Sequence, residues 1–255
     1  MSRNGRRFRL RKKPVTALVY ADGQSPFHDR RTWRLIVDFA RRMKPSLIIN
    51  LGDDADCYHW SSFSKSQQDA PPCARRWHAD AEITATQDKW EEIREAVPNA
   101  RRIYLEGNHE ARVRNFFQRN APDVETKDTD FESVFKVHDW WDYYGLDFNV
   151  GKLWFTHGST YAKYAARQML EAWGSSVVFG HAHRNLFWSH HLKNGDEHAA
   201  WGVPCHMTLD PHYLHRPDWS QGFGWARFAL SGWFNMAVIP IIRHRYVFGN
   251  GFFAG

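Results

Sequence analysis

Short runs of consecutive apolar residues alternate along the chain with segments in which apolar residues recur at helical spacing. The runs predict buried strands at 15–20, 47–51, 102–105, 148–156 and 176–179. The segments between them predict helices over 28–43, 75–96 and 161–173. In the first helix, for example, Trp33, Ile36 and Val37 fall on one face. The first two thirds of the chain are therefore predicted to alternate strand and helix.

After residue 183 the pattern changes to strands joined by turns. The sequence Asn-Gly-Asp at 194–196 predicts a hairpin turn. Apolar strands at 225–230 and 234–242 predict a second hairpin, and a last short strand is expected near 246–248. An antiparallel half added to an alternating half predicts an α/β fold, a two-sheet β-sandwich flanked by helices.

The size of the chain fits one large domain. Its 255 residues, 43% of them hydrophobic, can bury a full core without division into two. We expect a single domain over 14–255, preceded by a flexible basic arm over 1–13. The longest apolar stretch, 228–242, is broken by polar residues and is too short to span a bilayer, so no membrane partner is expected.

The N-terminus and the cysteines bear on location. A basic segment precedes the apolar run at 15–21, but no small-residue cleavage site follows it. Cys57, Cys73 and Cys205 are odd in number and follow no disulfide or zinc-ligand spacing. Free thiols suit a reducing compartment, so we expect a cytoplasmic protein.

Positive charge is concentrated at the N-terminus. The formal net charge is +6, from 34 basic and 28 acidic residues. Seven of the basic residues lie within 1–13, and subtracting these seven from the 34 leaves 27 against the same 28 acidic residues. The arm makes DNA or RNA a candidate partner, because clustered basic residues bind phosphate backbones. The rest of the chain is nearly neutral, which favours a small phosphoester as the substrate instead.

Each of the five predicted strands ends in polar residues, usually beside a glycine. In chain order these endings are Asp22-Gly23-Gln24, Gly52-Asp53-Asp54-Ala55-Asp56, Gly107-Asn108-His109-Glu110, His157-Gly158 and Gly180-His181-Ala182-His183. The carboxyl ends of strands in an open α/β sheet form its binding crevice, so these side chains are expected to converge. Carboxylate, amide and imidazole donors without cysteine favour a metal site over a structural zinc cage.

The order of these motifs, GDxxD, GNHE, H and GHxH, resembles the calcineurin-like metallophosphoesterases. The resemblance covers roughly residues 15 to 184. The C-terminal segments at 210–212 and 219–223 are similar to those of phage and prophage members. The resemblance implies a metallophosphoesterase fold and a hydrolase in which a hydroxide bridging two metal ions attacks a phosphoester.

The resemblance also implies a role for each motif residue. Asp53 would bridge both ions. The remaining ligands would be Asp22, Gln24 and His183 at the first ion, and Asn108, His157 and His181 at the second. His109 would lie over the ions as a catalytic residue near the substrate phosphate. Asp56 and Glu110 would orient the ligands.

The ions implied by the resemblance are two divalent metals. Manganese is expected first, and iron, zinc and nickel accept the same donors. One position departs from the family pattern, since the usual histidine of the first motif is Gln24 here. An amide oxygen is uncharged and donates more weakly than imidazole. Gln24 is therefore either a weak ligand or a neighbour of the ligands, and the first site is expected to be the looser one.

Three functions remain open from the sequence. The first is a phosphodiesterase or nuclease acting on nucleic acid, and the second is a phosphomonoesterase or small-nucleotide hydrolase. The third, a non-catalytic scaffold, is disfavoured by the intact GNHE and GHxH motifs. The arginines at 112, 114 and 119 follow the third motif and are candidates for contact with phosphate, but a solvated helix face is the expected position. The loop containing His206, His212 and His215 is a candidate for contact with substrate.

Overall fold

The computed structural model describes residues 6–8, 14–62, 78–124, 128–211 and 217–255. Its strands form two six-stranded sheets and a short hairpin. One sheet has the order β12-β11-β2-β3-β4-β5, with β2 Val15–Tyr20, β3 Leu47–Asn50, β4 Arg101–Leu105, β5 Tyr143–Gly145, β11 Gln221–Phe228 and β12 Phe234–Ile241. The other has the order β1-β6-β7-β8-β10-β9, with β1 Arg6–Phe8, β6 Asp147–Val150, β7 Leu153–Thr156, β8 Val177–Phe179, β9 Leu186–His191 and β10 Glu197–Gly202. The short hairpin joins β13 Arg245–Phe248 to β14 Gly251–Ala254.

The two large sheets pack face to face, and the alternation of side chains along the strands explains how. In β2, Val15, Ala17 and Val19 point into the core between the sheets, where they meet residues of the other sheet such as Phe155. Leu18, on the opposite face of β2, packs towards the helices. Because side chains alternate along a strand, an apolar run buried on both faces feeds two cores at once.

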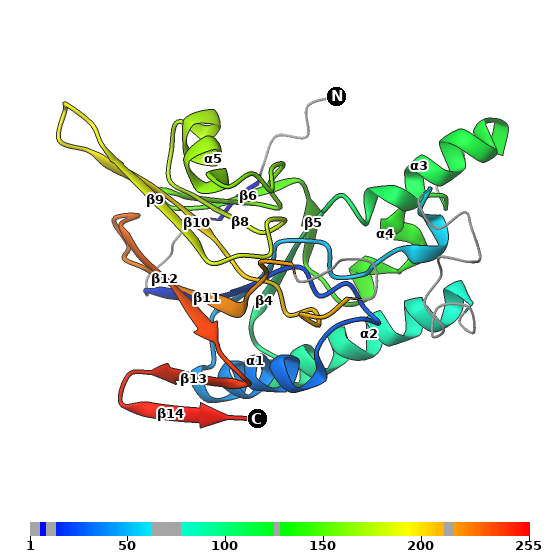
Figure 1. Cartoon of the computed structure of the whole chain (residues 1–255), viewed down its shortest axis with the longest axis horizontal. Coiled ribbons are helices and arrows are strands. Elements are labelled where there is room, and N and C mark those ends of the chain that lie inside the picture. The colour runs from blue at the N-terminus through cyan, green and yellow to red at the C-terminus, as the bar shows by residue number, and fades with distance from the viewer. Residues whose placement is uncertain (1–5, 9–13, 63–77, 125–127, 212–216) are drawn as a thin grey trace.

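Helices cover both outer faces, and Figure 1 shows them on opposite sides of the molecule. The helices are α1 Arg30–Met43, α2 Ala79–Ala96, α3 Ala111–Asn120, α4 Phe131–Val134 and α5 Ala165–Trp173. The 3-10 turns are η1 Tyr58–Trp60, η3 Pro122–Val124 and η4 Val137–Asp139. The helix α5 packs on β8 and β10 of one sheet, while α1 and α2 pack on the β2 side of the other. The predicted α/β class and two-sheet architecture are confirmed.

Several predicted elements differ from the structure. The run at 148–156 forms two antiparallel strands, β6 and β7, because Gly151 has a positive φ of 60° and turns the chain between them. The helix predicted over 75–96 is seen from Ala79 onward, and 63–77 lies outside the described residues. The strands β5 and β14 were not predicted from the sequence.

The N-terminal segment is only partly described. Residues 1–13 were expected to form a flexible arm, but Arg6–Phe8 form β1, which pairs in parallel with β6 at the edge of a sheet. The ring of Phe8 lies under the Arg101 guanidinium, 5.5 Å from its Cζ. Part of the expected arm is therefore a strand, and the other residues of 1–13 lie outside the described part of the chain. No described helix has the length and apolar character needed to cross a membrane.

Candidate metal centre

Five of the seven predicted metal ligands adopt a left-handed backbone conformation. Their φ angles are 55° at Asp22, 46° at Gln24, 52° at Asp53, 62° at His181 and 55° at His183. This conformation is costly for residues other than glycine and is kept where the surrounding structure imposes it. Its concentration at these positions is typical of a functional site, where backbone strain aims side chains at a common point.

Backbone hydrogen bonds join the loops that carry these residues. Asp22 N donates to Gly52 O at 3.0 Å and Gln24 N donates to Asp53 O at 2.9 Å, which ties the loops after β2 and β3 together. Gly52 has a φ of 99°, and a Cβ there would lie 2.6 Å from Gly107 N. Only glycine fits this contact, so the loop after β3 can approach the loop after β4.

Asp53, His157 and His181 form a cluster that could hold a metal ion. One ligand atom from each lies within 4.8 Å of the others. His157 Nε2 is 3.2 Å from Asp53 Oδ2, 3.2 Å from His181 Nδ1 and 3.1 Å from Asn108 Oδ1. These four residues are the ligands predicted for the second ion.

Hydrogen bonding sets the orientation of the His157 ring, and a nearby charge sets its pKa. Its Nδ1 donates to Leu51 O at 2.9 Å, which leaves Nε2 facing the cluster. Burial by itself would lower the pKa of His157, but the nearby Asp53 carboxylate outweighs burial and raises this pKa to about 9. The cluster thus carries enough negative charge to hold a proton where a divalent cation would bind.

The residues predicted for the first ion also lie together. His183 Nε2 is 3.3 Å from Asp22 Oδ1, and the amide Nε2 of Gln24 is 3.4 Å from the same His183 atom. Burial would lower the pKa of His183, but the Asp22 carboxylate raises it well above its ordinary value. The ring of Trp219 packs on His183 at a centroid distance of 4.4 Å. This aromatic contact was not predicted from the sequence.

His109 lies between the two groups of ligands. Its backbone N donates to Asp53 Oδ1 at 2.8 Å, and its ring Nε2 is 3.7 Å from Asp53 Oδ2 and 3.4 Å from Gln24 Nε2. The ring Nδ1 donates to the backbone O of Asp56 at 2.9 Å, and the Asp56 carboxylate is 3.2 Å away. Asp56 therefore orients the His109 ring.

Glu110 holds the loop after β3 in place. Its carboxylate accepts hydrogen bonds from the backbone N atoms of Asp53 and Asp54 and from the backbone N of Gly107, each at 2.9 Å. The hydroxyl of Tyr104 donates to the same carboxylate at 2.6 Å. Burial, together with the charge of Asp53, raises the pKa of Glu110 to about 7. Its hydrogen bonds are with backbone N atoms and with Tyr104, and its role in orienting the ligands stays a prediction.

A buried charged group surrounds Asp54, the residue next to Asp53. Lys89 Nζ is 2.5 Å from Asp54 Oδ1, and both side chains are fully buried. Trp90 Nε1 donates to Asp54 Oδ2 at 2.8 Å, and His206 Nε2 lies 3.1 Å from Lys89 Nζ. Burial alone would raise the pKa of Asp54, but the Lys89 ammonium holds it well below its usual range. His206 is therefore buried in this group, while His212 and His215 lie outside the described residues.

Arg112 was expected on a solvated helix face, but it reaches the site. Its Nη1 donates to Asp56 O at 2.7 Å and its Nη2 donates to His109 Nε2 at 2.9 Å. Arg114 and Arg119 do follow the expectation and are exposed. The sequence offered one sign of this difference, since Arg112 falls two residues after the GNHE motif.

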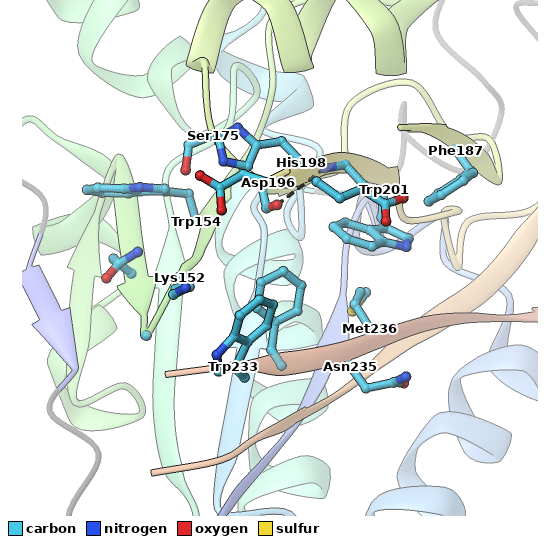
Figure 2. Close-up of a pocket in the computed structure, with 16 residues that line it drawn as sticks. Lys152, Trp154, Ser175, Phe187, Asp196, His198, Trp201, Trp233, Asn235 and Met236 are labelled. Atoms are coloured by element: carbon cyan, nitrogen blue, oxygen red, sulfur yellow. Dashed lines mark hydrogen bonds between the residues drawn. The ribbon is translucent and has the colours of Figure 1, made fainter. Parts of the chain in front are cut away.

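A cavity of about 550 Å³ lies elsewhere on the molecule. Trp154, Trp201 and Trp233 contribute to its walls, and Figure 2 shows the Lys152 side chain near Trp233. Lys152 precedes β7, whereas His157 follows it, so the cavity lies at the opposite end of the strands from the predicted ligands. It contains none of the motif residues, and we assign it no role in the chemistry.

The donors present fit divalent metal ions. Carboxylate oxygens, imidazole nitrogens and two side-chain amides converge, and this donor set matches manganese, iron, zinc or nickel. Cys205 is buried, and its Sγ donates to Ser220 O at 3.3 Å. Histidine Nε2 atoms that face buried carboxylates are the arrangement in which a cation replaces protons.

This chain is similar in sequence to phage proteins and in fold to several solved structures. No protein-family model matches the chain. Two curated relatives are gene 54 proteins of Mycobacterium phages. The phage D29 protein is 24% identical over 81% of this chain and 86% of its own length, and the phage L5 protein is 23% identical over 90% and 94%.

Solved structures with some similarity have been described as phosphoesterases, a nuclease and a sorting protein. They include Vacuolar Protein Sorting 29 from Cryptosporidium parvum (13% identity, TM-score 0.44, covering 89% of this chain and 97% of that one). The phosphoesterase YfcE from E. coli has 12% identity and a TM-score of 0.41, covering 85% and 93%. The nuclease MPE from Pseudomonas putida has 15% identity and a TM-score of 0.36, covering 82% of each chain. These values are too low to support an inference about activity.

The placement of the motifs is the stronger finding. All five strand-end motifs converge on one site at the edge of two packed sheets, in the order that the resemblance requires. The relatives in sequence are phage proteins. The order of the motifs and their convergence on one site support the resemblance of this chain to the calcineurin-like metallophosphoesterases.

Proposed function

We propose that this chain is a metal-dependent phosphoester hydrolase. The observation that carries the proposal is the convergence of Asp53, His157 and His181 from the ends of three strands. Asp22 and His183 form a second carboxylate-imidazole pair on the other side of His109. Two separate groups of donors support two ions rather than one, with Asp53 between them.

The residues that would hold the ions follow from this geometry. One ion would be held by Asp53, Asn108, His157 and His181, and the other by Asp22, Gln24, Asp53 and His183. Bound divalent ions would supply a water molecule acidic enough to attack phosphorus and positive charge for the phosphate oxygens. Manganese is the ion we propose first, since these donors accept it readily.

The protein's own contribution centres on His109. Asp56 fixes its ring from the Nδ1 side, so Nε2 faces the space above Asp53. A proton on Nε2 would stabilise charge on the phosphate or pass to the departing oxygen. The Asp53 loop is held by Glu110, so the carboxylate that both ions would share is fixed before substrate arrives. Neither role needs a covalent intermediate on the protein.

For the substrate we propose a phosphodiester, with DNA or RNA as the first candidates. The seven basic residues within 1–13 support this choice, because they provide an attraction to phosphate backbones that is independent of sequence. The near-neutral charge of the rest of the chain supports the second candidate, a phosphomonoester or small nucleotide. The intact GNHE and GHxH motifs disfavour a scaffold without catalysis.

A substrate panel with added manganese tests the proposal. It contains a nitrophenyl monoester, a bis-nitrophenyl diester, and labelled single- and double-stranded DNA. Hydrolysis of the diester and of DNA, lost in Asp53→Asn, is the expected result. Hydrolysis of the monoester alone would favour the second candidate. Full metal binding without hydrolysis of any member would indicate the scaffold.

A further inference from the structure

The guanidinium of Arg112 contacts two residues of the proposed site, Asp56 and His109. It donates one hydrogen bond to a backbone carbonyl, Asp56 O, and another to the ring of His109 at Nε2. Its side chain is 22% exposed, so it faces both the protein and solvent. This is the nitrogen of His109 that the proposed function leaves facing substrate.

The charge of Arg112 is poorly neutralised. Within the described part of the chain its ion pair is with Asp56, at 3.8 Å, which is beyond hydrogen-bond distance. By contrast, Arg114 pairs with Glu106 at 2.7 Å and Arg184 with Asp218 at 3.0 Å. A cation that hydrogen-bonds a carbonyl and an imidazole, and whose carboxylate partner is 3.8 Å away, retains attraction for an anion.

The position of Arg112 in its helix also favours binding of an anion. It lies in the first turn of α3, Ala111–Asn120, which contains no acidic residue. A cation is unfavourable at this end of a helix, where the backbone dipole already presents positive charge. Residues that break a local preference are often found at functional positions. An anion bound here would be attracted by both Arg112 and the helix end.

We propose that Arg112 binds a non-bridging oxygen of the substrate phosphate. This proposal rests on the proposed function and names a substrate-binding residue for it. Arginine suits the task because its planar fork can donate two hydrogen bonds to phosphate oxygens. On binding, the Nη2 donor passes from His109 Nε2 to the phosphate. The same exchange frees His109 Nε2 to face the departing oxygen.

The test compares three variants with wild-type protein loaded with manganese. Arg112→Gln removes the charge but keeps a donor for the Asp56 carbonyl, and Arg112→Lys keeps the charge. Arg119→Gln, on an exposed part of the same helix, is the matched control. Affinity for inorganic phosphate is measured by calorimetry, bound manganese by elemental analysis, and kcat and KM with the bis-nitrophenyl diester.

Arg112→Gln should weaken phosphate binding and raise KM by roughly 10- to 100-fold, as for the loss of one charge-assisted hydrogen bond. Its manganese content should match wild type. Arg112→Lys should restore part of the affinity, and Arg119→Gln should change nothing. Should the Gln variant fail to fold, Arg112→Met supplies the neutral side chain for the same comparison.

Three results would overturn the proposal. The first is a phosphate affinity in the neutral variant equal to that of wild type. A fall in kcat with KM and phosphate affinity unchanged would make Arg112 a positioning residue for His109. Loss of manganese would mean that Arg112 supports the metal site through Asp56. Arg112-dependent phosphate binding by a wild-type protein that hydrolyses no phosphoester would keep the role of Arg112 and contradict the proposed function.

Discussion

The amide nitrogen of Gln24 lies 3.4 Å from Nε2 of His183, its predicted partner at the first ion. The Gln24 side chain thus faces the site, and a half-turn of the amide would present its oxygen there. An uncharged amide is a weak donor, so protein purified without added metal should carry fewer than two ions. Gln24→His should tighten binding at this site by about 10- to 100-fold, the range known for changes around a metal. Competition with a chelator measures the affinity.

A wild-type protein that retains two ions through purification would contradict this expectation for Gln24. So would an affinity that is the same in Gln24→His and wild type. In the second case Gln24 would lie beside the ligands without binding an ion.

Substitutions at the site should separate metal ligands from the catalytic residue. Asp53→Asn removes the charge that both ions would share, and His181→Ala removes a donor from one cluster only. We expect the first variant to lose both ions, and the second to lose mainly one. His109→Ala should keep its metal and lose turnover by about 10²–10⁴, the usual contribution of a general acid. Elemental analysis alongside kcat distinguishes the three. Loss of metal in His109→Ala would make His109 a ligand.

Glu82 should make the stability of the protein depend on pH. Its carboxylate is buried, Oε1 accepts a hydrogen bond from Cys57 N, and among the described residues Oε2 has no hydrogen-bond partner. Burial, with a contribution from Asp56, raises the pKa of Glu82 to about 8, above its ordinary value of 4.5. The folded state therefore favours the protonated form, and ionisation costs stability as pH rises from 4.5 to 8.

Glu82→Gln isolates this effect, because glutamine keeps the acceptor for Cys57 N and cannot ionise. Relative to wild type, the variant should gain free energy of unfolding between pH 5 and pH 8, by up to about 1.4 kcal/mol per pH unit. Urea denaturation of both proteins at a series of pH values measures the difference. Parallel stability curves would show that Glu82 is ionised throughout.

The N-terminal charge should control binding to nucleic acid. Replacing Arg9, Arg11, Lys12 and Lys13 by glutamine leaves the β1 pairing of Arg6–Phe8 in place. We expect weaker binding to DNA and a flatter salt dependence, since each lost phosphate contact reduces the slope of log K against log salt by about 0.9 on duplex DNA. Hydrolysis of the bis-nitrophenyl diester should not change. Equal DNA affinity at several salt concentrations would remove the support for a nucleic-acid substrate.

The parts of the site that could be predicted are those encoded locally. A strand, a glycine and a side chain able to bind metal are neighbours in the sequence, as at Asp53 and His181. Their convergence follows from a general property of parallel strands, so it needs no knowledge of packing. The fold class followed from the same alternation. The strand at 148–156 was misjudged because one glycine, Gly151, is a weak signal within an apolar run.

The parts that could not be predicted depend on contacts between distant segments. Lys89 sits in a helix rich in charged residues and resembles a solvated side chain, yet it is buried against Asp54, 35 residues away. Arg112 reaches Asp56 across 56 residues, while its neighbour Arg114 does not. In both cases the side chain alone is ambiguous, and the tertiary fold decides which charge is buried and which is solvated.

The most direct test of the central claim is a titration of metal-depleted protein with manganese, followed by the rate of bis-nitrophenyl phosphate hydrolysis. Wild-type protein should be inactive in chelator and gain activity as manganese binds, reaching its full rate only when both sites fill. His181→Ala, treated identically, should not recover. Hydrolysis that persists in chelator, or full occupancy by manganese without any hydrolysis, would contradict the assignment of this site as a metal-dependent phosphoester hydrolase.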